Sequence, residues 1–298
     1  MKKYNIWFFV LLLVGCWAMP LQAQKKKPKK EKINTQHIDT PSMSFDLSYL
    51  KTEENLDNLY DLMADATNYL LIIAVDKYTY WKPLKNAVKD ANDVKSALVK
   101  RYRFDPKNVY EIYDDNVTAE RIRAMFEKLK ASIGPNDNLM IYFSGHGFYD
   151  ASFDEGYWIP YDGKIGQVST YIPNTNILNY IRAIDSRHTF LVADACFSGS
   201  MFADGNRGYL DKVEQLKSRW GLSSGNVEFV SDGKEGENSP FARYLLKFLN
   251  ENLKDRFSVT ELIQYVKVAV ADNTDQTPIG NPLKNVGNEG GEFVFYLK

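Results

Sequence analysis

Two apolar segments, each ending in small and polar residues, are the feature of this sequence that most constrains its fold. The first, Asn138–Gly147, reads NLMIYF followed by SGHG. The second, Thr189–Ser200, reads TFLVA followed by DACFSGS. Continuous apolar runs of this length are typical of buried parallel strands, and ligand sites of such sheets lie at the carboxyl ends of the strands. We therefore expect His146 and Cys196 to lie at one edge of a sheet.

Strand-like and helix-like segments alternate along the chain from residue 69 onward. The expected strands are Tyr69–Val75, Asn108–Tyr113, Asn138–Phe143, Thr189–Ala193, Arg219–Ser223 and Glu292–Leu297. Three expected helices begin at favourable caps, namely Thr118, Ser239 before Pro240, and the capping box Ser258–Glu261. Strands that alternate with helices predict a largely parallel sheet covered on both sides. We therefore predict an α/β fold with a mostly parallel six-stranded sheet and helices on both faces.

The first residues resemble an export signal. A basic start, the apolar run Ile6–Val14 and a c-region that ends at Ala23 predict a secretory signal peptide over residues 1–23. The run is shorter than the ~20 residues that a transmembrane helix needs. A competing interpretation is a bacterial lipobox, Leu13–Cys16, with lipidation of the cysteine. The tryptophan after that cysteine is unusual for a lipobox, so cleavage after Ala23 is favoured. Either way we expect an exported protein: periplasmic, secreted or, if lipidated at Cys16, membrane-anchored.

Charge separates a basic segment from an acidic remainder. Residues 24–46 are rich in Lys, Pro, Thr and Ser, which predicts a basic disordered linker before one folded domain over residues 47–298. Residues 33–298 hold 29 basic and 37 acidic side chains, a net charge of −8. An acidic folded part is a poor partner for nucleic acid, so we expect no nucleic acid to bind. We expect membrane contact only if Cys16 is lipidated.

The cysteine count points to a reactive thiol. The chain has two cysteines, Cys16 and Cys196. Cleavage after Ala23 removes the first and lipidation consumes it, so neither mature form can hold an intramolecular disulfide. A lone thiol in an exported protein indicates reactivity. The alternative is a buried cysteine that acts as a small hydrophobic residue. The position of Cys196 between a strand and a turn of small residues favours the reactive thiol.

A histidine and a cysteine at one sheet edge suit acyl transfer. A free cysteine is only a few per cent thiolate at neutral pH, and a neighbouring histidine can take its proton and later protonate a leaving amine. Gly145 and Gly147 allow the backbone close to a substrate. The amides of Gly147 and Cys196 are placed to converge on an oxyanion, an arrangement worth about 3 kcal/mol per donor. The pattern predicts amide hydrolysis by a thiol.

The two motifs together resemble those of the caspase-like cysteine peptidases (family C14), especially bacterial metacaspase-like members. Ser-Gly-His-Gly and Asp-Ala-Cys-Phe-Ser-Gly carry the resemblance. The resemblance extends from Tyr69 to Leu297. It includes the segment Lys85–Leu98 (KNAVKDANDVKSAL), the loop Ile159–Asp162 (IPYD) and the helix start Ser239–Ala242 (SPFA). The resemblance implies a caspase-like fold and cysteine endopeptidase activity. It also implies that His146 is the base, that Cys196 is the nucleophile, and that Gly147 with Cys196 forms the oxyanion hole.

One position departs from caspases and bears on specificity. Caspases have Gln two residues before the cysteine and select Asp at P1, the substrate residue on the acyl side of the scissile bond. This chain has Asp194 there, as metacaspases do, and the resemblance places that acid in the S1 pocket with Asp90 and Ser144. A carboxylate in a partly desolvated pocket favours Arg or Lys. The alternatives are that Asp194 binds loop amides, and that Asp90 is an N-cap or a solvent-facing helix residue.

Two other functions stay open at this point. The fold could serve a catalytically idle module that binds a partner or a peptide, or a clan relative with another P1 preference, such as Asn. His37 and His188 are interpreted as structural or solvated. The expected partners are protein or peptide substrates with a basic P1 residue.

Self-processing and metal dependence are the last expectations. The segment Asp204–Arg219 contains basic residues at which the chain could cleave itself, namely Arg207, Lys212 and Lys217. We expect no cofactor and assign no metal ligands. Calcium dependence occurs among metacaspases, but no convincing calcium site can be mapped from the sequence, so calcium dependence stays open.

Overall fold

The computed structural model describes residues 66–196, 199–202, 216–225 and 233–298. The predicted signal peptide, lipobox and basic linker, and most of the expected self-processing segment, lie outside these residues. None of the helices in the described part is long and apolar enough to cross a bilayer.

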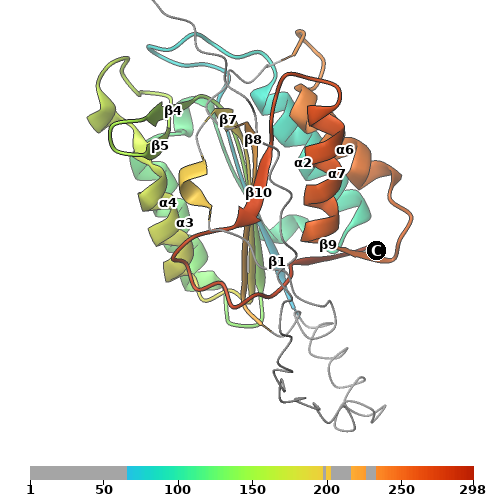
Figure 1. Ribbon diagram of the computed structural model, residues 1–298. Coiled ribbons are helices and arrows are strands. Elements are labelled where there is room, and N and C mark those ends of the chain that lie inside the picture. The colour runs from blue at the N-terminus through green and yellow to red at the C-terminus, as the bar shows by residue number, and fades with distance from the viewer. Residues whose placement is uncertain (1–65, 197–198, 203–215, 226–232) are drawn as a thin grey trace, which may run out of the picture. The chain divides into compact units, whose positions relative to one another are not determined.

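A six-stranded sheet in the order β10-β8-β7-β3-β1-β2 forms the centre of the domain (Figure 1). Its strands are β1 (Asn68–Ala74), β2 (Val109–Tyr113), β3 (Asn138–Ser144), β7 (His188–Cys196), β8 (Ser218–Gly225) and β10 (Ile279–Pro282). All neighbouring pairs are parallel except β10 with β8, which is antiparallel. The predicted α/β class and mostly parallel six-stranded sheet are confirmed.

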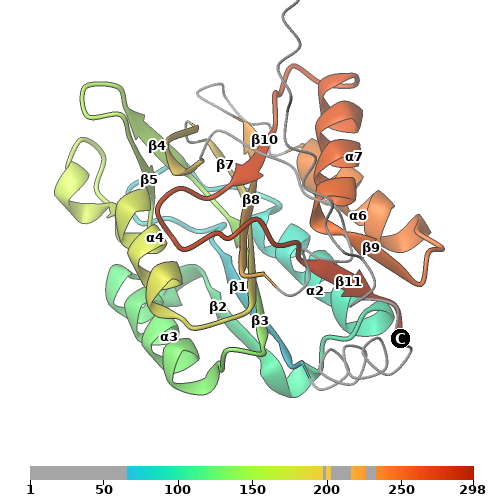
Figure 2. The same ribbon diagram turned by 60° about the horizontal axis from the view of Figure 1, so that its bottom comes forward.

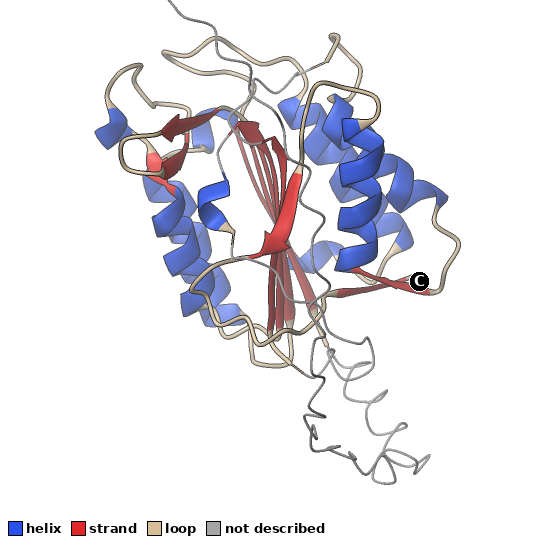
Figure 3. Cartoon of the chain, viewed as in Figure 1, coloured by secondary structure: helices blue, strands red, loops and turns tan. Residues whose placement is uncertain are grey.

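Helices cover both faces of this sheet (Figures 1 and 3). On one face lie α2 (Ala87–Arg101), α6 (Pro240–Glu251) and α7 (Val259–Ala271). On the other lie α3 (Ala119–Ser132) and α4 (Asn174–Ala183). Short 3₁₀ turns occur at Pro106–Asn108, Asp114–Asn116, Val168–Thr170 and Gly199–Met201. Helices on both faces bury the strands from both sides, which is why the strand sequences read as continuous apolar runs.

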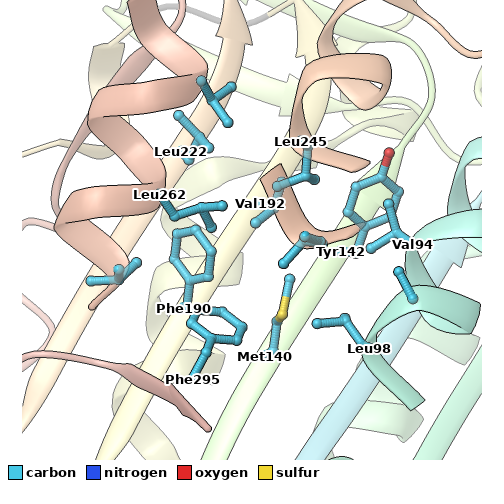
Figure 4. Packing of buried hydrophobic residues seen from close by; sticks show 14 of the residues in the cluster. Val94, Leu98, Met140, Tyr142, Phe190, Val192, Leu222, Leu245, Leu262 and Phe295 are labelled. Carbon is cyan, nitrogen blue, oxygen red and sulfur yellow. The ribbon is translucent and has the colours of Figure 1, made fainter. Parts of the chain in front are cut away.

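Side chains that alternate along each strand contribute to two hydrophobic cores, one on each face of the sheet. Met140 and Tyr142 of β3 pack with Phe190 and Val192 of β7 and with residues of α2, α6 and α7 (Figure 4). The intervening Ile141 belongs to the other core, with residues of α3 and α4. Successive side chains of a strand point to opposite faces, so residues of one parity share a core.

The sixth strand of the sheet is not the one expected from the sequence. The expected strand Glu292–Leu297 exists as β11 (Val294–Tyr296), but it pairs with β9 (Arg256–Ser258) in a separate two-stranded sheet (Figure 2). Instead, β10 is the outermost strand of the central sheet, next to β8. Its sequence, IGNP, lacks a strand pattern because Gly280 lies against α7: a Cβ there would come within 2.3 Å of Ile263.

A small three-stranded β-sheet follows the His146 strand. β4 (Gly147–Asp150) and β5 (Glu155–Trp158) form an antiparallel hairpin, and β6 (Ile172–Pro173) pairs with β5. The ring of Trp158 stacks on Phe143 of β3, with ring centroids 4.1 Å apart, which fixes the hairpin to the central sheet. The hairpin thus extends the segment that begins at His146.

The predicted helix caps are confirmed. The hydroxyl of Thr118 accepts the amide N–H of Arg121, and that of Ser239 accepts the amide N–H of Ala242 at the start of α6. Ser258 and Glu261 form the predicted capping box of α7.

Replacing Ser258 with alanine should lower the free energy of unfolding by about 1 kcal/mol, because the amide N–H of Glu261 loses its acceptor at a buried helix start. Chemical denaturation followed by circular dichroism measures this change. We expect the slope of the denaturation curve to stay the same. An unchanged midpoint would show that the capping box does not contribute to stability.

Candidate active site

Contacts with three residues hold His146, which follows β3 and is half-buried. Its backbone N–H donates to the hydroxyl of Tyr78 over 2.7 Å, and its Nε2 lies 2.7 Å from the carbonyl oxygen of Lys82. The rings of Tyr78 and Trp81 lie 4.7 Å and 5.4 Å from the imidazole, centroid to centroid. A carbonyl oxygen only accepts, so Nε2 carries the hydrogen, and Nδ1 is the basic nitrogen of the neutral ring.

Gly145 permits a close approach that a larger residue would block. A Cβ at this position would lie 2.6 Å from the hydroxyl of Tyr78. The amide N–H of Gly145 donates to the carbonyl oxygen of Asp194 over 3.3 Å, which joins the end of β3 to β7. Gly147, the predicted oxyanion donor, begins β4 opposite Trp158. The glycines of the Ser-Gly-His-Gly motif therefore lie where the chain leaves the sheet.

The strand register brings the segments of His146 and Cys196 together. Ser144 of β3 is paired with Asp194 of β7, so His146 and Cys196 each follow a paired residue by two positions on adjacent parallel strands. Cys196 is the last residue of β7, and the register of β7 with β8 shifts between Ala193 and Cys196. The predicted edge of the sheet is where the structure places both segments.

Two buried carboxylates lie on the α2 and α6 side of this edge. Asp90, in the first turn of α2, is 1 % exposed, and Asp194 is 6 % exposed. Asp90 accepts hydrogen bonds from the side-chain amide of Asn238 (2.7 Å) and from the backbone N–H of Ser239 (3.1 Å). Asp194 accepts one from the hydroxyl of Ser239 (2.6 Å). One residue thus bridges two acids from elements far apart in the sequence.

Strand parity places Ser144 on the same face as these acids. Met140 and Tyr142 of β3 face the core under α2 and α6, so Ser144, two residues on, points to the same side. Ser144 is 3 % exposed. The three residues predicted for S1 therefore share one face of the sheet, and Tyr142 lies beneath them.

Burial and neighbouring negative charges raise the pKa values of Asp90 and Tyr142. The pKa of Asp90 is raised from 3.8 to about 7, first by burial and then by the negative charge of Asp194. Hydrogen bonds from Asn238 and Ser239 oppose the rise because they stabilise the carboxylate. The pKa of Tyr142 is raised well above 10 by burial and by the charges of both acids.

The structure contradicts the alternative interpretations of Asp90. The N-cap of α2 is Asn86, and Asp90 lies inside the helix and is buried, so Asp90 neither caps α2 nor faces solvent. Asp194 accepts a hydrogen bond from the side chain of Ser239, which leaves its alternative role as an acceptor for loop amides untested. Asn238 was not predicted from the sequence, and Ser239 was predicted only as a helix cap. No local pattern marks them, since their contacts reach 145 to 149 residues back to α2.

Other predicted positions lie away from this edge. His188 begins β7, is 5 % exposed, and its Nδ1 lies 2.9 Å from the hydroxyl of Ser218, as suits a structural residue. Lys217, just before β8, pairs with Asp185 over 2.6 Å. Arg207 and Lys212 lie outside the described residues. Within the described ranges no group of three or more His, Cys, Asp or Glu side chains is arranged to hold a metal ion.

Comparison with known proteins identifies the family of this chain. The caspase domain of peptidase family C14 matches residues 67–285. Metacaspase-1 of Eremothecium gossypii is 27 % identical over 148 residues, which cover 44 % of this chain and 31 % of that protein, so the match spans about a third of the relative's length. The crystal structure of protein GSU0716 from Geobacter sulfurreducens superposes with a TM-score of 0.53 at 16 % identity, over 72 % of this chain and 93 % of that one, and shares its fold. Because the caspase domain spans most of the sequence, this chain belongs to the caspase-domain family of cysteine peptidases.

Proposed function

We propose that this protein is an exported cysteine endopeptidase that hydrolyses peptide bonds after Arg or Lys. The observation that carries the specificity is the buried pair Asp90 and Asp194, bridged by Ser239 on the face of the sheet that also holds Ser144. The pair lies at the strand ends that lead to His146 and Cys196. A guanidinium or ammonium group is the substrate group that two such carboxylates bind best.

The chemistry assigned to the dyad proceeds through an acyl-enzyme. Nδ1 of His146 takes the proton of the Cys196 thiol, and the sulfur attacks the scissile carbonyl carbon. The backbone amides of Gly147 and Cys196 donate to the oxyanion. The tetrahedral intermediate collapses as Nδ1–H protonates the leaving amine, which leaves a thioester. Water then gives a proton to Nδ1, attacks the thioester and releases the acid, and the sulfur takes the proton back.

Contacts of His146 support its role as the base. The hydrogen bond from Nε2–H to the carbonyl oxygen of Lys82 orients the ring and stabilises the imidazolium that forms during each step. Tyr78 fixes the backbone of the same residue. The base therefore needs no acidic third residue to select its tautomer.

Export rests on the sequence of the first 23 residues. The basic start, the short apolar run and the c-region ending at Ala23 support cleavage by a signal peptidase. Mass spectrometry of the mature protein tests this proposal. A chain that begins at Gln24 supports it, a lipid on Cys16 assigns the protein to the membrane, and an intact Met1 contradicts export.

A peptide library that varies only the P1 residue tests the proposed activity. We expect turnover with Arg or Lys at P1 and little with Asp or Asn. Preference for Asp or Asn would contradict the S1 assignment while keeping the peptidase. Absence of turnover, together with no covalent adduct on Cys196 from a thiol-reactive probe with a basic P1 residue, would favour the idle binding module.

Selectivity for a basic P1 residue should increase with pH. Because the pKa of Asp90 is about 7, its carboxylate forms between pH 6 and pH 8 and adds a second negative charge to S1. The measurement is the ratio of kcat/KM for an Arg substrate to that for its uncharged citrulline analogue, because pH effects on the chemical steps that both substrates share cancel in this ratio. We expect it to rise with an apparent pKa near 7.

Replacing Asp90 with asparagine is the control, and it should flatten the ratio. A ratio that still rises with pH in this variant would assign the titration to another group.

The raised pKa of Asp90 also affects the stability of the fold, with the opposite sign. Between pH 3.8 and about 7 the folded chain keeps a proton on Asp90 that the unfolded chain has lost, so this group makes stability fall as pH rises.

A further inference from the structure

The two residues before α6 connect the acid pair to a helix start. Ser239 is 3 % exposed and is the N-cap of α6. Its hydroxyl accepts the amide N–H of Ala242 over 3.0 Å and donates its own hydrogen to Asp194 over 2.6 Å. A hydroxyl has one hydrogen to donate. The cap geometry therefore leaves that hydrogen for Asp194.

The backbone of the same residue serves the other acid. The N–H of Ser239 donates to Oδ2 of Asp90 over 3.1 Å, while the side-chain amide of Asn238 donates to Oδ1 of Asp90 and to Asp93. Both oxygens of Asp90 thus accept hydrogen bonds from residues 238–239. The orientation of the carboxylate relative to Asp194 is set by one dipeptide.

The N-terminus of α6 stabilises negative charge on the two carboxylates. α6 is 12 residues long, and the partial positive charge of a helix N-terminus stabilises anions in its first turn. Both carboxylates contact the N-cap residue, so both lie within range of that field. Two buried acids repel each other, and the N-terminus of α6 offsets part of this repulsion.

The segment that carries Ser239 is tied to the start of α2. The side-chain amide of Asn86 donates to the carbonyl oxygen of Lys234 over 2.9 Å and accepts the N–H of Gly236 over 3.0 Å. Asn86 is fully buried and lies four residues before Asp90. The turn before α6 and the helix that bears Asp90 therefore hold each other in register.

We propose that Ser239 is a positioning residue for P1 recognition, which holds Asp90 and Asp194 as one site for a guanidinium or ammonium group. The inference rests on the proposed function, because it assigns the acid pair to S1. Ser239 acts through the two carboxylates and does not touch the reacting atoms.

Among the residues that the structure describes, the charged and titratable groups around the pair come from three elements. Asp93 of α2 is bridged through Asn238 and paired with Lys89, Tyr142 of β3 lies beneath, and each acid faces the other. The side-chain amide of Asn238 and the backbone N–H of Ser239 lower the pKa of Asp90, and both donors remain in Ser239→Ala. A change of Arg selectivity in that variant therefore reports the lost hydrogen bond to Asp194.

Replacing Ser239 with alanine tests the proposal. We expect the Arg-to-citrulline ratio of kcat/KM to fall about tenfold, mainly through a higher KM for the Arg substrate, since a charge-assisted hydrogen bond is lost. Turnover of the citrulline substrate should change less than threefold. Ser239→Thr retains a hydroxyl and a good cap, so it should restore the ratio.

Ser258→Ala is the matched control, because it removes the equivalent cap from α7, which does not contact the acid pair. It should lower stability and leave the ratio unchanged. If Ser239→Ala does not fold, Ser239→Gly removes the same hydroxyl at a position where glycine is an acceptable N-cap. An unchanged ratio in a folded Ser239 variant, or an equal loss on both substrates, would overturn the proposal. A wild-type protein that does not prefer Arg or Lys would instead overturn the proposed function.

Discussion

Replacing Cys196 with alanine is expected to lower kcat for peptides with a basic P1 residue by at least about 10⁴-fold, which leaves only the background that binding and oxyanion donors provide. The physical reason is that alanine offers no nucleophile, so no thioester forms and the two-step reaction cannot begin. Continuous assay of an Arg substrate measures the loss, and the intact mass after incubation with a basic chloromethyl ketone shows whether an adduct forms.

The chain supplies its own matched control. Cys16 is the other cysteine, and Cys16→Ala should keep the full rate and label normally, because this residue is proposed to lie in the signal segment. His146→Ala should cost nearly as much as Cys196→Ala, and the double variant should be no worse than either, since the two residues act as one unit. Residual activity of Cys196→Ala above one per cent would assign the nucleophile to another residue.

The central strands of the fold could be predicted because the sequence of each strand shows that the strand is buried. Strands flanked by helices on both faces read as apolar runs, and β1, β3 and β7 lie where such runs occur. β10 could not be found in this way, because its glycine is required by the close approach of Ile263 on α7, a contact across the fold. β11 has a strand-like sequence, but its apolar side chains pack on β9, with the rings of Phe257 and Phe295 stacked 4.9 Å apart.

In the candidate site too, some residues are marked by local sequence motifs and others are defined only by long-range contacts. His146 follows β3 and Cys196 ends β7, each inside a recognisable motif, so their placement at one edge follows from the parallel sheet. Asp90 was assigned by resemblance alone, since its own helix offers no sign that it is buried. Ser239 looks like an ordinary cap in the sequence. Its second role depends on tertiary contacts with Asp90 and Asp194 that no spacing rule encodes.

Replacing Asp194 with asparagine should lower kcat/KM for Arg substrates by about 100-fold, roughly 2.7 kcal/mol, with little change for citrulline substrates. Asparagine has almost the same shape, and its carbonyl oxygen can still accept the hydroxyl hydrogen of Ser239. The variant therefore removes charge and keeps the packing. Steady-state kinetics on the paired substrates, with thermal unfolding as a check on folding, measures the effect. Equal losses on both substrates would indicate that Asp194 supports the dyad rather than S1.

The pH dependence of this variant distinguishes a coupled pair from two independent acids. The charge of Asp194 is the second cause of the raised pKa of Asp90, after burial. Its removal should lower the pKa of Asp90, so the rise in Arg selectivity should move to lower pH in Asp194→Asn. Such a displacement requires that the two carboxylates interact. If the rise stays near pH 7 in Asp194→Asn, the two carboxylates do not act as one S1 site.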